Sequence, residues 1–223
     1  MALSMSDGFH RRIYFFGEYE RATTALFRSL VGAGSTVFDV GANVGYFSML
    51  SCELGAGVVR AFEPNPTVRE LLVRNASLQP IDIDIIPAAC SDHEGTMPLY
   101  LAGPSNTGAS SLTGAGGEDS VVVDVITLDA YAERTNTRPD LLKIDVEGHE
   151  REVLAGAGSL LDTKRPTVIA EVGEDKRDDV VELMRSHRYQ PHSILADGSL
   201  GVHGPKRKRG PENICFRPDP LSV

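Results

Sequence analysis

The chain has 223 residues, of which 41% are hydrophobic and 24% are charged, and this size and composition suit one globular domain with its own core. Its 22 Lys and Arg residues against 31 Asp and Glu residues give a formal net charge of −9, and a field of this sign repels the phosphates of nucleic acids. No window approaches the ~20 consecutive apolar residues of a membrane-spanning helix, so the composition excludes a membrane span and disfavours a nucleic-acid partner.

The N-terminus and the cysteines bear on the cellular compartment. Asp7, Arg11 and Arg12 interrupt the first residues before any apolar stretch long enough for a signal-peptide core. Three cysteines, odd in number and far apart, form neither a disulfide framework nor a zinc motif. We therefore expect a cytoplasmic protein with buried thiols and no membrane partner, and the sequence assigns no oligomeric state.

Short apolar runs alternate with amphipathic segments along the chain, as strands alternate with helices. Strands are predicted at residues 35–43, 58–64, 81–89, 96–101, 120–126, 140–146, 167–172, 189–195 and 213–217. Helices are predicted at residues 19–31, 45–54, after a capping box at 67–70, as one helix that spans 153–161, and at 178–187. At least five alternations indicate an α/β fold, a doubly wound and mostly parallel sheet with helices on both faces. The last two strands are expected to pair as an antiparallel hairpin.

Three segments fall outside this alternation. Residues 1–34 are expected to form an N-terminal helical segment that packs on the sheet or caps the site of the domain, which spans residues 35–223. Residues 103–117 are rich in Gly and Ser and too long for a tight turn, so they form either a disordered surface loop or a lid. The basic run at 206–209 is interpreted as a solvated loop, with a phosphate or partner patch as the alternative.

The first strand ends in a glycine-containing turn at the edge where such sheets bind ligands. Asp39 precedes the turn, and Gly41, Asn43 and Gly45 lead into a helix. Glycine lets the backbone turn and approach a ligand closely, while the acid argues against a pyrophosphate and suits a cationic or amino-bearing ligand. Glu63 ends the second strand, where a carboxylate accepts both hydroxyls of an unphosphorylated ribose. Its alternative role is that of a surface acid at a helix start.

The next two strand ends carry further polar residues. The third strand is followed by Ser91 and Asp92, where Asp92 either accepts from an adenine amino group or caps a turn. The strand at 140–146 contains Lys143 and Asp145 on one face. A central parallel strand is normally apolar on both faces. Burying these charges is costly unless they pair with each other or serve a site.

Acidic residues continue at the same edge of the sheet. Glu147 and His149 directly follow the strand at 140–146, and Glu171 interrupts the apolar strand at 167–172. Two interpretations stay open. The residues form a reactive site, or Lys143 makes a structural ion pair while the other acids are exposed at a helix start.

Four blocks of the sequence resemble the signature of a known family. The segments FDVGANVG at 38–45, FEPN at 62–65, LKIDVEGHE at 142–150 and IAEV at 169–172 look like those of the FkbM-type S-adenosylmethionine-dependent methyltransferases. The resemblance spans residues 36–217. It implies a class I methyltransferase domain with a Rossmann-like, seven-stranded sheet and a reversed terminal strand.

The resemblance also implies a cofactor and a reaction. S-adenosylmethionine is the expected cofactor, with its methionine part, ribose and adenine bordered by Asp39, Gly41, Asn43, Gly45, Glu63, Asn65, Ser91 and Asp92. Members of the family methylate hydroxyls, and occasionally amines, on polyketides, sugars and other small molecules. We therefore expect an O-methyltransferase of natural-product or glycan tailoring that acts on a small-molecule acceptor. The alternatives are N-methylation, a non-catalytic cofactor-binding module and, lowest, an NAD-dependent oxidoreductase.

The acceptor side is expected to comprise Lys143, Asp145, Glu147, His149 and Glu171. An alcohol is a weak nucleophile at neutral pH, so it needs a neighbouring base or a metal ion that acidifies it. Asp145 and Glu171 are favoured as base or orienting groups. His149 is the alternative base, although its position at a helix start favours an exposed surface role. Mg²⁺ prefers oxygen ligands, but no convincing third ligand is found beyond Glu147, so base or orienting roles are favoured over a divalent metal, which stays the alternative.

Overall fold

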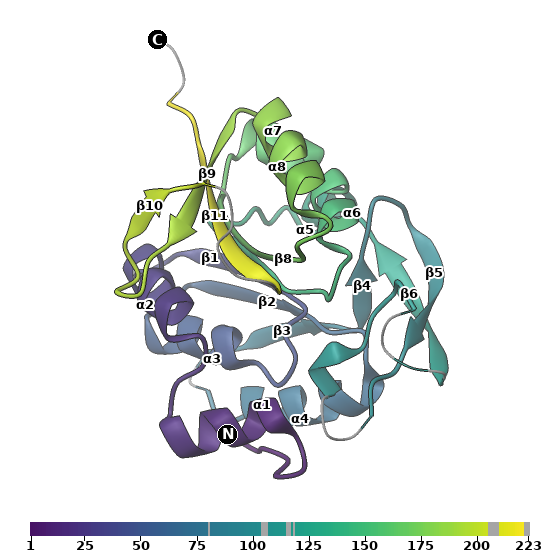
Figure 1. Ribbon diagram of the computed structural model, residues 1–223. Helices are drawn as coiled ribbons and strands as arrows, with labels where there is room; N and C mark the ends of the chain where they lie inside the picture. Colours follow the sequence, from purple (N-terminus) through teal and green to yellow (C-terminus); the bar gives the residue numbers. More distant parts are fainter. Residues whose placement is uncertain (80, 104–106, 115–116, 118, 205–209, 221–223) are drawn as a thin grey trace.

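An eight-stranded sheet forms the centre of the computed structural model, which describes residues 1–79, 81–103, 107–114, 117, 119–204 and 210–220 (Figure 1). The strands lie in the order β10-β9-β11-β8-β7-β1-β2-β3. Their bounds are β1 (Thr36–Val40), β2 (Val58–Phe62), β3 (Ile83–Ile86), β7 (Leu141–Ile144), β8 (Thr167–Val172), β9 (Tyr189–Ile194), β10 (Leu200–Val202) and β11 (Glu212–Pro218). Strands β3, β2, β1, β7 and β8 pair in parallel, whereas β11 is antiparallel to both β8 and β9. The mostly parallel sheet with a reversed terminal strand is confirmed, and the short edge strand β10 adds to the seven expected.

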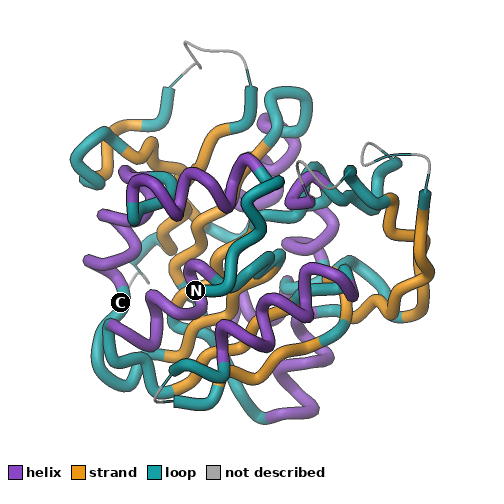
Figure 2. The backbone as a smooth tube through the Cα atoms, turned by 90° about the horizontal axis from the view of Figure 1, so that it is seen from below, coloured by secondary structure: helices purple, strands orange, loops and turns teal. Residues whose placement is uncertain are grey.

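Helices cover both faces of this sheet. They are α1 (Gly8–Phe16), α2 (Arg21–Leu30), α3 (Tyr46–Glu53), α4 (Pro66–Ala76), α5 (Leu128–Thr135), α6 (Glu150–Ala155), α7 (Gly158–Thr163) and α8 (Arg177–Ser186). Side chains alternate between the faces of a strand, so Phe38 of β1 joins a core with α5 to α8. Its neighbour Val37 joins a second core with α2, α3 and α4. Figure 1 shows α5 to α8 above the sheet and α1, α3 and α4 below it, and Figure 2 shows the molecule from the side of these lower helices.

A second, three-stranded sheet lies beside the first. It has the order β4-β6-β5 and consists of β4 (Ala88–Cys90), β5 (Gly95–Tyr100) and β6 (Ser120–Ile126). The single strand expected at residues 81–89 is therefore wrong. It breaks at Pro87, which has no N–H to donate to a ladder, and β3 and β4 on either side join different sheets.

Two helix predictions need correction. The expected capping box at 67–70 is wrong, because α4 begins at Pro66 and the side chain of Asn65 already accepts from the backbone N–H of Thr67 at 3.0 Å. The single helix across 153–161 is two helices, α6 and α7, that meet near Gly156. A Cβ at Gly156 would lie 1.9 Å from the carbonyl oxygen of Ser91, so the backbone is packed tightly against the end of β4 there.

The N-terminal segment packs on the α2–α4 face. Helix α1, which the sequence analysis did not predict, inserts Ile13 beside Val44 and Val68. Helix α2 places Phe27 against Phe47, with ring centroids 5.0 Å apart. Among the described residues, no helix is long and apolar enough to cross a membrane. The cysteines are buried and free, as expected, and the basic run at 206–209 lies outside the described residues.

Candidate active site

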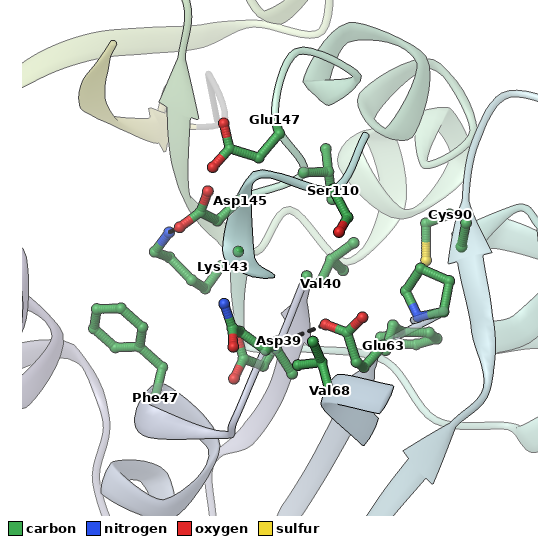
Figure 3. A pocket seen from close by; sticks show the side chains of 18 of the residues that line it. Asp39, Val40, Phe47, Glu63, Val68, Cys90, Ser110, Lys143, Asp145 and Glu147 are labelled. Atoms are coloured by element: carbon green, nitrogen blue, oxygen red, sulfur yellow. Dashed lines mark hydrogen bonds and ion pairs between the residues drawn. The ribbon is translucent and has the colours of Figure 1, made fainter. Parts of the chain in front are cut away.

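A cavity of about 1060 Å³, counting its open mouth, lies at the carboxyl ends of β1, β2 and β7 (Figure 3). Its walls come from the turn after β1, the ends of β2, β4 and β7, residues 108–112, and Tyr19 of the N-terminal segment. The cavity lies at the edge where doubly wound sheets bind ligands.

The turn after β1 brings the backbone into direct contact with the end of β7. Gly41 has a φ of 78°, and a Cβ at this position would lie 1.8 Å from the carbonyl oxygen of Asp145. Only glycine fits both the conformation and the space. The N–H groups of Gly41 and Ala42 donate to the carbonyl of Phe62 at 3.0 Å, which fixes the turn against β2.

Glu63 braces the turns after β1 and β2 from inside the cavity wall. Its side chain is 7% exposed, and its two oxygens accept from the N–H groups of Asn43 at 2.9 Å and Asn65 at 2.8 Å. Burial raises the pKa of Glu63 to about 7, against the lowering effect of these two donors. A carboxylate oxygen has more than one acceptor site, so Glu63 still has capacity for the hydroxyls of a ligand.

Asp39 forms the floor of the cavity near the start of α3. The side chain is 2% exposed, and Ser48 Oγ donates to Asp39 Oδ2 at 2.6 Å. Burial raises the pKa of Asp39 to about 6, while the bond from Ser48 and the charge of Lys143 lower it. A buried acid in this position favours a ligand that carries positive charge.

Lys143, which is fully buried, forms an ion pair with the half-buried Asp145 on the opposite side of the cavity from Glu63 (Figure 3). Lys143 Nζ lies 3.6 Å from Asp145 Oδ2 and 5.3 Å from the ring centroid of Phe47. Burial acts to lower the pKa of Lys143, but the surrounding carboxylates outweigh it and the pKa lies above its usual value. The sequence analysis kept a structural ion pair of Lys143 as an alternative to a reactive site. This ion pair is present, and both Lys143 and Asp145 line the cavity.

Glu147 projects from the loop after β7 and also lines the cavity. Its φ of 53° is in the left-handed region, an unfavourable conformation for a non-glycine residue that is often found at functional sites. Burial, with Asp145 and Glu150 nearby, raises the pKa of Glu147 to about 7. Ser111 Oγ donates to the backbone carbonyl of Glu147 at 2.8 Å. This hydrogen bond fixes the loop after β7 to the segment at residues 107–114.

Glu20 of the N-terminal segment joins the acceptor side, which the sequence analysis missed. Carboxylate oxygens of Glu20, Asp145 and Glu171 all lie within 4.8 Å of one another. Asn213 Nδ2 donates to Glu20 Oε1 at 2.9 Å. Burial first, and then Asp145, raise the pKa of Glu171 to about 9. The third oxygen ligand that the sequence lacked is therefore available, since such oxygens suit Mg²⁺.

Some predicted site residues lie away from the cavity wall. His149 is 7% exposed, so its expected surface role is wrong, and its Nε2 lies 2.9 Å from Ser91 Oγ. Asp92 is exposed and pairs with His93 at 2.7 Å. Asn65 caps α4, and Glu171 lies within 4.8 Å of Asp145 but does not line the cavity. Among the described residues, Asp39, Gly41, Asn43, Glu63, Lys143, Asp145 and Glu147 are the predicted ones that line the cavity.

The described part of the Gly/Ser-rich segment covers the cavity. Residues 107–114 include the short helix η1 (Thr107–Ala109), and Gly108, Ser110 and Leu112 line the wall. Ser110 Oγ accepts from Asn65 Nδ2 at 3.2 Å, so the segment contacts the side of the cavity that Glu63 forms. Residues 104–106 and 115–116 lie outside the described residues.

The fold matches that of known methyltransferases. A TehB-like SAM-dependent methyltransferase from Corynebacterium glutamicum shares it with a TM-score of 0.52, 10% identity and 94% coverage of both chains. The crystal structure of methyltransferase FkbM from Methylobacillus flagellatus gives a TM-score of 0.59 at 15% identity, over 91% of this chain and 49% of that one. Together with the cavity at the strand ends, these likenesses define a Rossmann-like methyltransferase fold.

Sequence comparison identifies the family within this class. The methyltransferase FkbM domain matches residues 39–191. Hexuronic acid methyltransferase AglP from Haloferax volcanii is 32% identical over 145 residues, which are 64% of this chain and 58% of AglP. The 31-O-demethyl-FK506 methyltransferase FkbM from Streptomyces tacrolimicus is 30% identical over 191 residues, covering 70% of this chain and 73% of that protein. The chain belongs to the FkbM methyltransferase family, which confirms the resemblance of the sequence blocks.

Proposed function

We propose that the protein transfers a methyl group from S-adenosylmethionine to a hydroxyl of a small molecule. The observation that carries this proposal is one cavity with two chemically different sides. On one side the turn after β1 is braced by the buried carboxylate of Glu63, and on the other Asp145 and Glu147 face the same space. The relatives support it, since one is named for a hexuronic acid and another for demethyl-FK506.

The residues of the first side fit this cofactor. Glu63 has acceptor capacity for ribose hydroxyls, and Asp39 suits the positive charge of the methionine part. Gly41 leaves the turn without a Cβ, and Asn43 Oδ1 is buried with no hydrogen-bond partner among the described residues. A buried acceptor without a partner is costly unless a ligand donor reaches it. When bound, the cofactor supplies a methyl group that the sulfonium charge has already activated.

Glu147 is the base in this proposal. The acceptor hydroxyl must lose a proton, and general bases work best when their pKa lies near the operating pH. Glu147 lines the cavity, and burial together with Asp145 and Glu150 raises its pKa to about 7. Its carboxylate is therefore substantially ionised at neutral pH while remaining a stronger base than a carboxylate of ordinary pKa.

Asp145 and Glu171 have supporting roles. Lys143 lies 3.6 Å from Asp145 and pairs with it. Asp145 positions the acceptor by accepting a hydrogen bond from a neighbouring donor group of the molecule, because the single proton of the reacting hydroxyl goes to Glu147. Burial and Asp145 raise the pKa of Glu171 to about 9, so Glu171 stays protonated at neutral pH and cannot act as the base. It is a positioning residue that shares a hydrogen bond with Asp145.

Two measurements test this function. Calorimetry with S-adenosylhomocysteine tests the cofactor, and transfer of a labelled methyl group to a panel of hydroxyl-bearing sugars and polyketides tests the reaction. Glu147→Gln should lower turnover by about 10²- to 10⁴-fold and leave S-adenosylhomocysteine affinity nearly unchanged. The matched control is Glu174→Gln, because Glu174 is an exposed acid outside the cavity wall.

The outcomes separate the alternatives. Binding without turnover across the panel identifies a non-catalytic binding module, and turnover confined to amines identifies an N-methyltransferase. Tight NAD binding without S-adenosylhomocysteine binding contradicts the cofactor assignment. Equal turnover in Glu147→Gln and the control removes Glu147 from the role of base.

A further inference from the structure

Helix α1 presents an aromatic and basic outer face. Tyr14, Phe15 and Phe16 are 64%, 67% and 77% exposed, and Arg11 and Arg12 are also exposed. Residues four apart lie on the same side of a helix, so each arginine stands one turn before a phenylalanine. The inner side buries His10 and Ile13 instead. The outer face thus has a basic end followed by an aromatic end.

This face lies beside the cavity. Ile13 packs with Val44 and with Val68, and Val68 lines the cavity. Two residues separate Phe16 from Tyr19, which also lines the cavity and lies among its acidic groups. A chain of three peptide units spans at most about 11 Å, so the Cα atoms of Phe16 and Tyr19 lie within that distance of each other.

The size of the patch argues against a protein partner. Aromatic side chains bury ~150–250 Å² each when they are fully covered. Because about two thirds of each of the three side chains is exposed, together they offer roughly 300–500 Å² to a partner. A stable protein interface needs ~800 Å² from each partner.

The chemistry of the patch fits a lipid surface. Aromatic rings partition to the level of lipid headgroups, and arginines beside them bind lipid phosphates. We propose that α1 docks the protein on anionic lipid surfaces, with Phe15 and Phe16 at the interface and Arg11 and Arg12 on the phosphates. This departs from the expectation of no membrane partner, which rested on the lack of a membrane span. Docking brings the acceptor side of the cavity next to the lipid.

The net charge of the chain makes this docking weak and sensitive to salt. A formal charge of −9 opposes approach to an anionic surface, but charges separated by more than about 10 Å are largely screened at moderate ionic strength. The two arginines therefore act locally. Burying two or three rings gives a reversible attachment rather than a permanent one.

Co-sedimentation of the full chain with vesicles tests the proposal. We expect binding to phosphatidylcholine–phosphatidylglycerol vesicles and little binding to phosphatidylcholine alone. The double variant Phe15→Ser, Phe16→Ser should lower binding at least tenfold, and Arg11→Gln, Arg12→Gln should remove the preference for phosphatidylglycerol. The matched control is Val122→Ser, because Val122 on β6 is 76% exposed outside the patch.

A local reporter adds a second readout. The chain has no Trp, so Phe16→Trp places a single indole on the patch, and its emission should shift to the blue with anionic vesicles. Each variant must keep the thermal unfolding midpoint and the S-adenosylhomocysteine affinity of the wild type, which separates this test from that of the proposed function. Absence of vesicle binding, or an equal loss in Val122→Ser, overturns the proposal. So does a wild-type dimer in light scattering that the double phenylalanine variant dissociates.

Discussion

The protonation state of Glu63 should control how tightly the cavity holds the cofactor. Its oxygens already accept from Asn43 and Asn65, and burial raises its pKa to about 7. Ribose hydroxyls donate hydrogen bonds, so they bind the ionised carboxylate better than the neutral acid. We expect S-adenosylhomocysteine affinity to fall as the pH drops below about 7.

The structure sets the size of this effect. One pH unit below the pKa leaves about a tenth of the carboxylate ionised, so affinity falls about tenfold, or ~1.36 kcal/mol per unit. Glu63→Gln removes the charged acceptor and should weaken binding by about 1.5–3 kcal/mol, the range for hydrogen bonds to charged groups. That loss corresponds to roughly a 10- to 150-fold rise in Kd, and the pH dependence should flatten.

The same carboxyl group affects folding with the opposite pH trend. In the folded protein Glu63 keeps its proton up to about pH 7, whereas its ordinary pKa is 4.5. The folded state therefore binds more protons in this window, and the free energy of unfolding falls as the pH rises through it. Cofactor binding favours the ionised form, so the thermal shift caused by S-adenosylhomocysteine should grow as the pH rises.

Calorimetry from about pH 5.5 to about 8.5 brackets this titration. Asp39 is the necessary control, because burial raises its pKa to about 6 and it titrates in the same range. Asp39→Asn should keep the transition near pH 7, and Glu63→Gln should lose it. A flat profile in the wild type, or an unchanged transition in Glu63→Gln, would refute the reasoning.

Three further predictions address the turn, the acidic cluster and metal dependence. Gly41→Ala should lower the free energy of unfolding in urea by more than ~2 kcal/mol, because the added Cβ would lie 1.8 Å from a backbone oxygen. The control is Gly32→Ala, whose added Cβ meets open space, so it should lower the free energy of unfolding much less. Glu171→Gln should keep turnover within about threefold, since it retains a donor near Asp145, while Asp145→Asn should lose about 10²; equal losses would contradict their separate roles. A chelator should leave turnover unchanged, and loss restored by Mg²⁺ would instead assign the acidic cluster to a cation.

The cofactor side could be predicted because its residues are close in sequence. The turn from Asp39 to Gly45 follows a strand directly, and a glycine that must adopt a positive φ is visible as a residue type. Glu63 ends the next strand, so the parallel pairing of β1 and β2 brings it to the same edge. Local pattern and topology were enough to bring Asp39, Gly41, Asn43 and Glu63 into one cavity. The other residues predicted for the cofactor do not line it, namely Gly45, Asn65, Ser91 and Asp92.

The positions of Glu20 and helix α1 depend on contacts that no local pattern shows. Glu20 lies 125 positions before Asp145, and nothing around it resembles a motif. Helix α1 has nine residues, and helices shorter than ~12–15 residues are marginal by themselves, so it depends on the packing of Ile13. The wrong prediction of a single strand at 81–89 could have been avoided from the sequence. Pro87 interrupts this apolar run, and proline is rare inside central strands.

The choice of base follows from charge balance, which residue identity alone does not give. The carboxylates that act on the single charge of Lys143 are Asp145, Glu20, Glu171 and Asp39. One cation cannot stabilise every ionised form in a buried cluster, because each unpaired charge is costly there. Asp145 pairs with Lys143 at 3.6 Å, while burial and Asp145 raise the pKa of Glu171 to about 9 and keep it protonated. Glu147 lines the cavity with a pKa of about 7, so it can accept a proton at neutral pH and release it again after each turnover.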